Sequence, residues 1–190
     1  MSPPVIESNE AEKEGILNSA KLMLIAARTA PKSAGIDDIL TMLINGKEKD
    51  AIADKMAEIA TSRKLEGFNR DAKNVRDSEA VILIGVRGHR VLGLDCGACG
   101  HGSCKEFEGA KPNSGEDFLG PTCLFKALDL GIALGSAAKT ASILDIDSRI
   151  MYRIGAAASK LGLLPEASVI MGIPVSAKGK SIYFDRPVKM

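Results

Sequence analysis

Residues 80–86, AVILIGV, form an uninterrupted apolar run of strand length. A strand without alternating polar residues is typical of the middle of a layered structure, where neighbouring elements cover both of its faces. The run therefore predicts the central strand of a sheet with helices packed on either side.

Other segments are expected to extend this sheet. Residues 36–44, IDDILTMLI, fit either a helical turn or a buried strand, and we favour a strand that ends at the following Asn-Gly turn. Residues 167–173, ASVIMGI, form a second run of the buried-strand type, and Pro174 is expected to stop it. A short last strand is expected over residues 181–187, SIYFDRP.

Apolar residues at three- and four-residue spacing predict helices between these strands. The first helix is expected to begin at a capping box formed by Asn9 and Glu12 and to stop at Pro31. A second is expected over residues 48–63, and a partly helical stretch follows it.

A long helix is predicted over residues 124–144, and it contains Gly131 and Gly135. Small residues four positions apart let another backbone come close. We therefore interpret them as a sign of tight helix–helix packing, with the approach of a ligand as the alternative.

The last helix is expected to be capped by Asp147 or Ser148 and to end at Gly162. Strands that alternate with helices indicate α/β layering. Residues 1–190 are therefore expected to form a single domain of the α+β class, with helices layered on a sheet.

The composition narrows the classes of function. Of the 190 residues, 45% are hydrophobic and 26% are charged, which is ordinary for a soluble globular protein. With a formal net charge of +1 and 4% aromatic residues, the chain gives no indication of binding nucleic acid or an anionic membrane. The N-terminal residues lack the pattern of a secretory signal, and charged residues interrupt the longest apolar stretch. We therefore expect a cytoplasmic protein that does not span a membrane.

All four cysteines lie in one segment with the spacing C-x2-C-x4-C-x18-C: Cys96, Cys99, Cys104 and Cys123. Three thiols in a glycine-rich loop and a fourth further on are able to surround an iron–sulfur cluster, because thiolates are its usual ligands. Recognisable helix and strand material flanks this segment closely. We therefore interpret residues 96–123 as an insertion in the layered domain.

Three other interpretations of the cysteines stay open. Zinc also binds four thiolates, although structural zinc usually lies between two separate short knuckles. Disulfides are the blandest interpretation, but nothing else indicates an oxidising compartment. A nucleophilic cysteine would need a base, and the two histidines, His89 and His101, form no recognisable triad.

The loop after the first helix, residues 26–35 (AARTAPKSAG), places Arg28, Lys32 and Ser33 among small residues. The simple interpretation is a helix exit with solvated charges. The functional interpretation is an anion pocket, because free amides and basic side chains in a short loop suit phosphate.

The run CGACGHGSCKEF, residues 96–107, resembles the small 4Fe–4S domain of anaerobic electron-transfer and corrinoid-reducing proteins. The match rests on Cys96, Cys99, Gly100, Cys104 and Phe107, and the resemblance implies that Cys123 is the fourth ligand. The whole chain is similar to a family of ferredoxin-domain-containing proteins found mainly in anaerobes. That similarity is clearest in residues 130–155 and 173–187.

The scaffold resembles the fold of FMN-dependent nitroreductases. The similar stretches are residues 26–35, 130–141 and 161–176. This resemblance implies a nitroreductase-like sandwich, a homodimer and FMN at the dimer interface. It also implies that the flavin phosphate is contacted by Arg28, Lys32, Ser33, Lys180 and Arg186.

The leading hypothesis is an iron–sulfur redox protein that transfers electrons through a 4Fe–4S cluster, with FMN as a donor or acceptor. Such a pair would link one-electron to two-electron chemistry. The partner would be a redox protein or a small-molecule electron donor or acceptor. The alternative is a non-catalytic binding or assembly protein in which zinc staples the cysteine loop.

Overall fold

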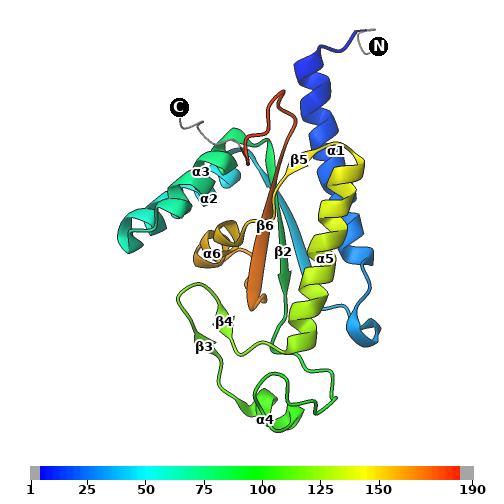
Figure 1. The fold of residues 1–190 in the computed structure, drawn as a ribbon, viewed down its shortest axis with the longest axis vertical. Coiled ribbons are helices and arrows are strands. Elements are labelled where there is room, and N and C mark those ends of the chain that lie inside the picture. Colours follow the sequence, from blue (N-terminus) through cyan, green and yellow to red (C-terminus); the bar gives the residue numbers. More distant parts are fainter. Residues whose placement is uncertain (1–4, 185–190) are drawn as a thin grey trace.

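The computed structural model describes residues 5–184. Its centre is an antiparallel sheet with the strand order β1 (Ile39–Asn45), β2 (Ala80–Val86), β6 (Val169–Ser176) and β5 (Asp147–Ser148). One face is covered by α1 (Ser8–Thr29) and α5 (Leu124–Ile143). The other is covered by α2 (Gly46–Arg63), α3 (Glu66–Asp77) and α6 (Tyr152–Lys160) (Figure 1).

Strand β2 lies between two hydrophobic cores, as its sequence predicts. Val81 and Leu83 belong to the core under α2, α3 and α6, whereas Ile82 and Ile84 belong to the core under α1 and α5. Every residue of the strand is buried. Because all the pairings are antiparallel, the uninterrupted apolar run results from helical layers on both faces and does not require parallel strands.

The strand predicted within residues 36–44 is confirmed as β1. The expected stop at Pro174 is wrong, because β6 continues to Ser176 and Pro174 pairs with Val81 of β2. The outer strand β5 pairs with only the last two residues of β6, so the sheet tolerates a residue without an amide N–H here. Residues 181–184 form no strand, and the rest of that expected strand lies outside the described residues.

The first helix is confirmed, but its capping box is wrong. Asn9 and Glu12 lie inside α1, which begins at Ser8. The Ser8 hydroxyl donates to the Glu12 carboxylate at 2.7 Å, so this pair lies within the first turn. The expected helix over residues 48–63 is confirmed by α2, and α3 accounts for much of the stretch that follows.

The cap expected at Asp147 or Ser148 is also wrong, because both residues pair with the end of β6 as β5. Helix α6 begins instead at Tyr152. Gly162 follows its last turn with φ of +71°, the left-handed conformation that glycine supplies after a helix, and this prediction is confirmed.

The long helix α5 is confirmed, but its glycines do not contact another part of the same chain. A Cβ atom added at Gly131 or Gly135 would meet no atom of the described residues within 4 Å. Both glycines lie on the exposed side of α5. The interpretation of this pair as a packing contact is therefore wrong within one protomer.

Gly155 is the glycine that close packing does require. A Cβ atom there would lie 1.7 Å from the carbonyl oxygen of Ile170, so α6 sits directly on β6. We expect Gly155→Ala to lower the free energy of unfolding by about 2–3 kcal/mol, because the helix must move away from the strand. Gly15→Ala, in an open position of α1, is the control and should stabilise by about 0.5–1 kcal/mol. Equal effects in chemical denaturation would contradict the close contact.

The cysteine segment emerges at one end of the sheet, where β2 ends and β6 begins. It contains α4 (Cys104–Gly109) and a hairpin of β3 (Asn113–Ser114) and β4 (Leu119–Gly120), and it returns to the start of α5. The short helix η1 (Ser33–Gly35) follows α1 at the same end, just before β1 begins (Figure 1). Both segments that the sequence singles out therefore lie at this end of the molecule.

Candidate metal centre

The loop that carries the first three cysteines is folded by tight backbone turns. Gly97 and Gly100 have φ of +69° and +88°, which glycine adopts without steric cost. The backbone amide of Cys104 donates to the Asp95 carboxylate at 2.6 Å, and the Ser103 hydroxyl accepts from an amide in the first turn of α4. These contacts hold the start of α4 against the loop that precedes it.

The four thiols differ in exposure, and all are free. Cys96 is exposed, Cys99 and Cys104 are half-buried, and Cys123 is buried. Cys123 is the N-cap of α5, and its amide donates to the carbonyl of Gly88 at 2.8 Å. The fourth thiol is thus fixed to the backbone that leads from β2 into the cysteine loop.

This donor set fits a thiolate-ligated cluster in kind, because it offers four reduced cysteines at one end of the fold. The side chains are not gathered around one point. Among residues 5–184, no three His, Cys, Asp or Glu side chains are grouped closely enough to hold a metal ion.

Phe107 forms the floor of the loop and is 2% exposed. The centroid of its ring lies 5.5 Å from that of the His101 ring, in an edge-to-face arrangement, and 6.4 Å from that of the His89 ring, which is tilted relative to it. Both histidines therefore contact the buried ring of Phe107.

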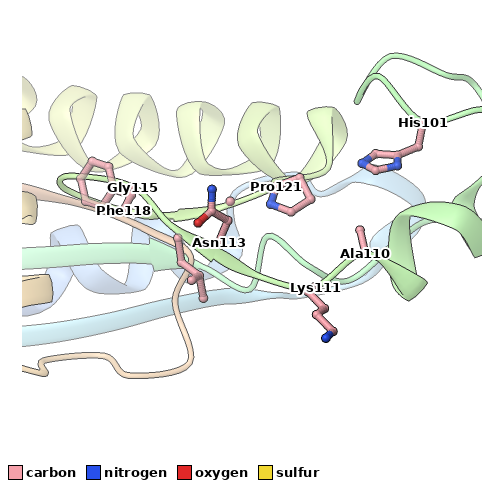
Figure 2. A pocket seen from close by; sticks show the side chains of 9 residues that line it. His101, Ala110, Lys111, Asn113, Gly115, Phe118 and Pro121 are labelled. Carbon is pink, nitrogen blue, oxygen red and sulfur yellow. The ribbon is translucent and has the colours of Figure 1, made fainter.

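A cavity of about 610 Å³ opens beside the loop. Figure 2 shows His101 at one end of its lining and Phe118, on the hairpin, at the other, with Pro121 and Asn113 between them. The lining is mixed, with apolar rings beside an imidazole and an amide. The residues that line it lie between Cys99 and Cys123 in the sequence, and none of them is a cysteine.

The hairpin that borders this cavity is anchored by one carboxylate. Asp117 accepts a hydrogen bond from Arg63 at 2.6 Å and another from the hydroxyl of Tyr152. Partial burial opposes ionisation of Asp117, but these two bonds outweigh it, so the pKa of Asp117 lies below its usual range. The hairpin is thereby tied to α2 and α6.

Burial, together with the bond to Asp117, raises the pKa of Tyr152 to about 12. Because this folded pKa exceeds the unfolded value, the associated stability is present below about pH 10 and is lost as the pH rises towards 12. We expect Asp117→Asn to lower the pKa of Tyr152 towards 10, measured by phenolate absorbance. The chain has two tyrosines and no tryptophan, so Tyr152→Phe identifies the transition. An unchanged pKa would show that Asp117 does not cause the shift.

The basic side chains of the loop after α1 are occupied within the protein. Arg28 donates to the Asp37 carboxylate at 2.5 Å and to the carbonyl of Ile39 at 2.6 Å. Lys32 donates to the carbonyl of Arg28 and lies 3.8 Å from Asp37. Burial opposes ionisation of Asp37, but the bonds from Arg28 and the Ile39 amide lower its pKa overall. One carboxylate therefore already occupies the place between the two cations.

The other predicted flavin contacts lie elsewhere. The amide and hydroxyl of Ser33 both donate to Asp129 of α5 at 2.8 Å. Lys180 belongs to the segment after β6, which leaves the sheet at the end opposite to η1 (Figure 1). Arg186 lies outside the described residues. One protomer thus brings Arg28, Lys32 and Ser33 together but not Lys180.

Sequence reasoning missed a buried charged cluster beside the fourth cysteine. Lys126 is 0% exposed, and its ammonium lies 2.8 Å from Oδ2 of Asp38, which is 1% exposed. These atoms are in ionic contact but poorly aligned for a hydrogen bond. Oδ1 of Asp38 accepts a hydrogen bond from Arg90 at 3.0 Å. The available signal was the pair Lys126 and Asp129 in an otherwise apolar helical stretch.

No helix in the described part of the chain combines the length and apolar character needed to cross a bilayer.

Comparison with known sequences identifies relatives of this chain. Residues 119–186 match the model of a family described as "Uncharacterized protein containing a ferredoxin domain", a range that includes Cys123 but not Cys96, Cys99 or Cys104. An uncharacterized protein from Archaeoglobus fulgidus is 50% identical over 185 residues, which cover 97% of this chain and 99% of that protein.

Comparison with solved structures identifies the fold. The nitroreductase CinD from Lactococcus lactis, in complex with nicotinic acid, superposes with a TM-score of 0.59 at 11% identity, over 93% of this chain and 82% of that one. A putative nitroreductase in complex with FMN from Desulfovibrio desulfuricans gives a TM-score of 0.53 at 16% identity, over 99% and 84%. The chain therefore belongs to the family of uncharacterized proteins that contain a ferredoxin domain, and its fold is that of the nitroreductases.

Proposed function

We propose that the protein is an iron–sulfur redox protein that transfers electrons through a 4Fe–4S cluster bound by Cys96, Cys99, Cys104 and Cys123. The observation that carries the proposal is the presence of four free thiols at one end of the fold, in a chain of the ferredoxin-domain family. Family and fold both indicate a redox function. In this proposal the chain is one domain, residues 96–123 are its cluster-binding insertion, and the reducing cytoplasm keeps the thiols free.

When bound, the cluster supplies one-electron chemistry, and the chain sets its surroundings. Cys123 is the N-cap of the twenty-residue helix α5, so the helix fixes the backbone of the fourth ligand. The left-handed turns at Gly97 and Gly100 fold the backbone that carries the other three cysteines.

We include FMN as a second cofactor, with its phosphate bound by Arg28, Lys32 and Ser33. Arg28 and Lys32 already hold the Asp37 carboxylate between them, so in this proposal the phosphate displaces Asp37. Ser33 fits less directly, because both of its donors already serve Asp129. Lys180 completes the set from a second copy of the chain, since the segment that carries it leaves the opposite end of the sheet. Arg186 lies outside the described residues and stays a predicted contact.

The surface of α5 supports a homodimer. Two of its charged residues, Lys126 and Asp129, are buried, and the third, Lys139, is exposed in the second half of the helix. In the first half, Leu128 and Ile132 are 50% and 44% exposed, in the stretch that contains Gly131. An outer surface that is apolar over residues 124–135 indicates a partner on that side.

We expect Leu128→Glu and Ile132→Glu to convert the dimer to monomer, because a buried glutamate would lack a counter-charge. Light scattering coupled to size exclusion measures the change. Leu94→Glu, at a residue that is 56% exposed in the cysteine segment, is the matched control and should stay dimeric. A monomeric wild-type protein would contradict the dimer.

The cluster is tested by purifying the protein without oxygen and assaying iron, acid-labile sulfide, zinc and flavin. We expect a brown protein whose dithionite-reduced form gives an electron paramagnetic resonance signal. Zinc without iron would support the alternative, a structural metal site in a binding or assembly protein. A metal-free, colourless product would exclude both, and flavin in the heat-released supernatant tests FMN separately.

A further inference from the structure

The carboxylate of Asp38 contacts both ends of the segment that carries the cysteines. Oδ1 accepts a hydrogen bond from Arg90, shortly before Cys96, and Oδ2 lies against the ammonium of Lys126, one turn after Cys123. Each oxygen therefore serves one arm of the segment.

The main chain reinforces this junction. The carbonyl of Asp38 accepts a hydrogen bond from the amide of Arg87 at 3.0 Å, and the carbonyl of Gly88 accepts one from Cys123 at 2.8 Å. The amide of Gly88 in turn donates to the Ser168 hydroxyl at 3.0 Å. The chain that enters the cysteine segment and the chain that returns from it thus meet beside the start of β1.

A buried ion pair is not the most stable filling for this space. Well-packed apolar side chains of similar volume are often as stable as a buried pair or more so, because they need no desolvation of charge. Asp129, the buried carboxylate of α5, accepts hydrogen bonds from Ser33 and makes none with Arg90 or Lys126. Contact with both arms is therefore a property of Asp38.

We propose that Asp38 is a positioning residue that clasps the two ends of the cysteine segment and so sets Cys123 relative to Cys96, Cys99 and Cys104. This inference rests on the proposed function, in which the four thiols share one cluster. Arg90 and Lys126 are the two halves of the clasp. Opening either half frees Cys123, which is 8% exposed, to move away from the loop.

The first test measures thiol accessibility in the reduced full-length protein after removal of metal. A short pulse of iodoacetamide is followed by mass spectrometry of the peptide that contains Cys123. Arg90→Gln removes a guanidinium that is 63% exposed and leaves Asp38 paired with Lys126, so the variant is expected to fold. We expect Cys123 to be labelled about tenfold faster than in the wild type, because local opening becomes more frequent.

Arg87→Gln is the matched control. It removes an arginine at the same end of the sheet, whose side chain pairs with Glu166 and not with Asp38. Labelling of Cys123 should then stay at the wild-type rate. Lys126→Met opens the other half of the clasp and should accelerate labelling as Arg90→Gln does.

The second test is the electron paramagnetic resonance spectrum of the same variants after anaerobic reconstitution. Altered line shape or a lower iron content in Arg90→Gln and Lys126→Met, with a wild-type signal in Arg87→Gln, supports positioning of Cys123. Unchanged labelling in both clasp variants overturns the proposal, as does faster labelling with a wild-type spectrum. A wild-type protein that takes up no iron would overturn the proposed function, whereas the labelling result would still decide whether the clasp exists.

Discussion

Cys99→Ser is expected to reduce bound iron from about four atoms per chain to less than one, with loss of the visible colour and of the paramagnetic signal. A serine hydroxyl stays protonated near neutral pH. It is therefore a poor replacement for a thiolate, the soft ligand that binds the iron of the cluster. The chain has four cysteines, and all of them belong to the proposed ligand set, so no further thiol is available to replace Cys99. Iron and sulfide assays on protein purified without oxygen measure the effect.

Lys105→Gln is the control for this experiment, because it changes an exposed residue next to Cys104 without removing a sulfur. It should retain the iron content and the spectrum of the wild type. Loss of zinc instead of iron in Cys99→Ser would favour the structural-metal alternative.

Cys123→Ser tests the fourth ligand directly, because this cysteine lies outside the three-cysteine loop. We expect it to lose iron as fully as Cys99→Ser, since a cubane cluster needs a fourth thiolate. Retention of a complete cluster in Cys123→Ser would show that the buried thiol is not a ligand. The proposed ligand set would then be wrong, even if the protein proved to bind iron.

Asp38→Asn is expected to lower the free energy of unfolding by about 3–5 kcal/mol, because it leaves the Lys126 ammonium buried without a counter-charge. Lys126 is fully buried, and no described side chain other than Asp38 pairs with it as an ion. The substitution also removes the negative charge opposite Arg90, but that guanidinium is largely exposed, so the lost ion pair contributes little.

The matched variant is the double substitution Asp38→Leu with Lys126→Met. It removes both charges and fills the space with apolar atoms, so we expect stability within about 1 kcal/mol of the wild type. Urea denaturation of the wild type, Asp38→Asn, Asp38→Leu, Lys126→Met and the double variant measures the differences, and strong non-additivity of Asp38→Leu and Lys126→Met is the signature of direct pairing. A double variant as unstable as Asp38→Asn would show that packing, and not charge, determines the loss.

The clearest predictions came from segments whose pattern depends on local chemistry. The apolar run of β2 has no polar residue that could face solvent, so its central place in the sheet was predictable from the sequence. The left-handed Gly162 after α6 is a local backbone preference of the same kind. That the four thiols form one donor set stays a prediction from their spacing.

The errors arose where partners distant in the chain decide the outcome. Pro174 reads locally as the end of a strand, yet the short pairing of β5 leaves its outer side free. Asp147 and Ser148 read as a helix cap, but the end of β6 takes them as a strand. Gly131 and Gly135 read as a packing contact, and the fold places them outside.

The sequence by itself determined the layered α+β class and the central strand, because burial preference is a property of individual residues and their spacing. It also predicts the thiol donor set, because ligand chemistry depends on residue type and spacing. Only the tertiary structure decided that Asp38 meets Arg90 and Lys126, that Ser33 is tied to Asp129, and that Lys180 lies far from Arg28. Such contacts join residues that are remote in the chain. Their charges are stable in the interior only where the complete fold supplies an opposite partner.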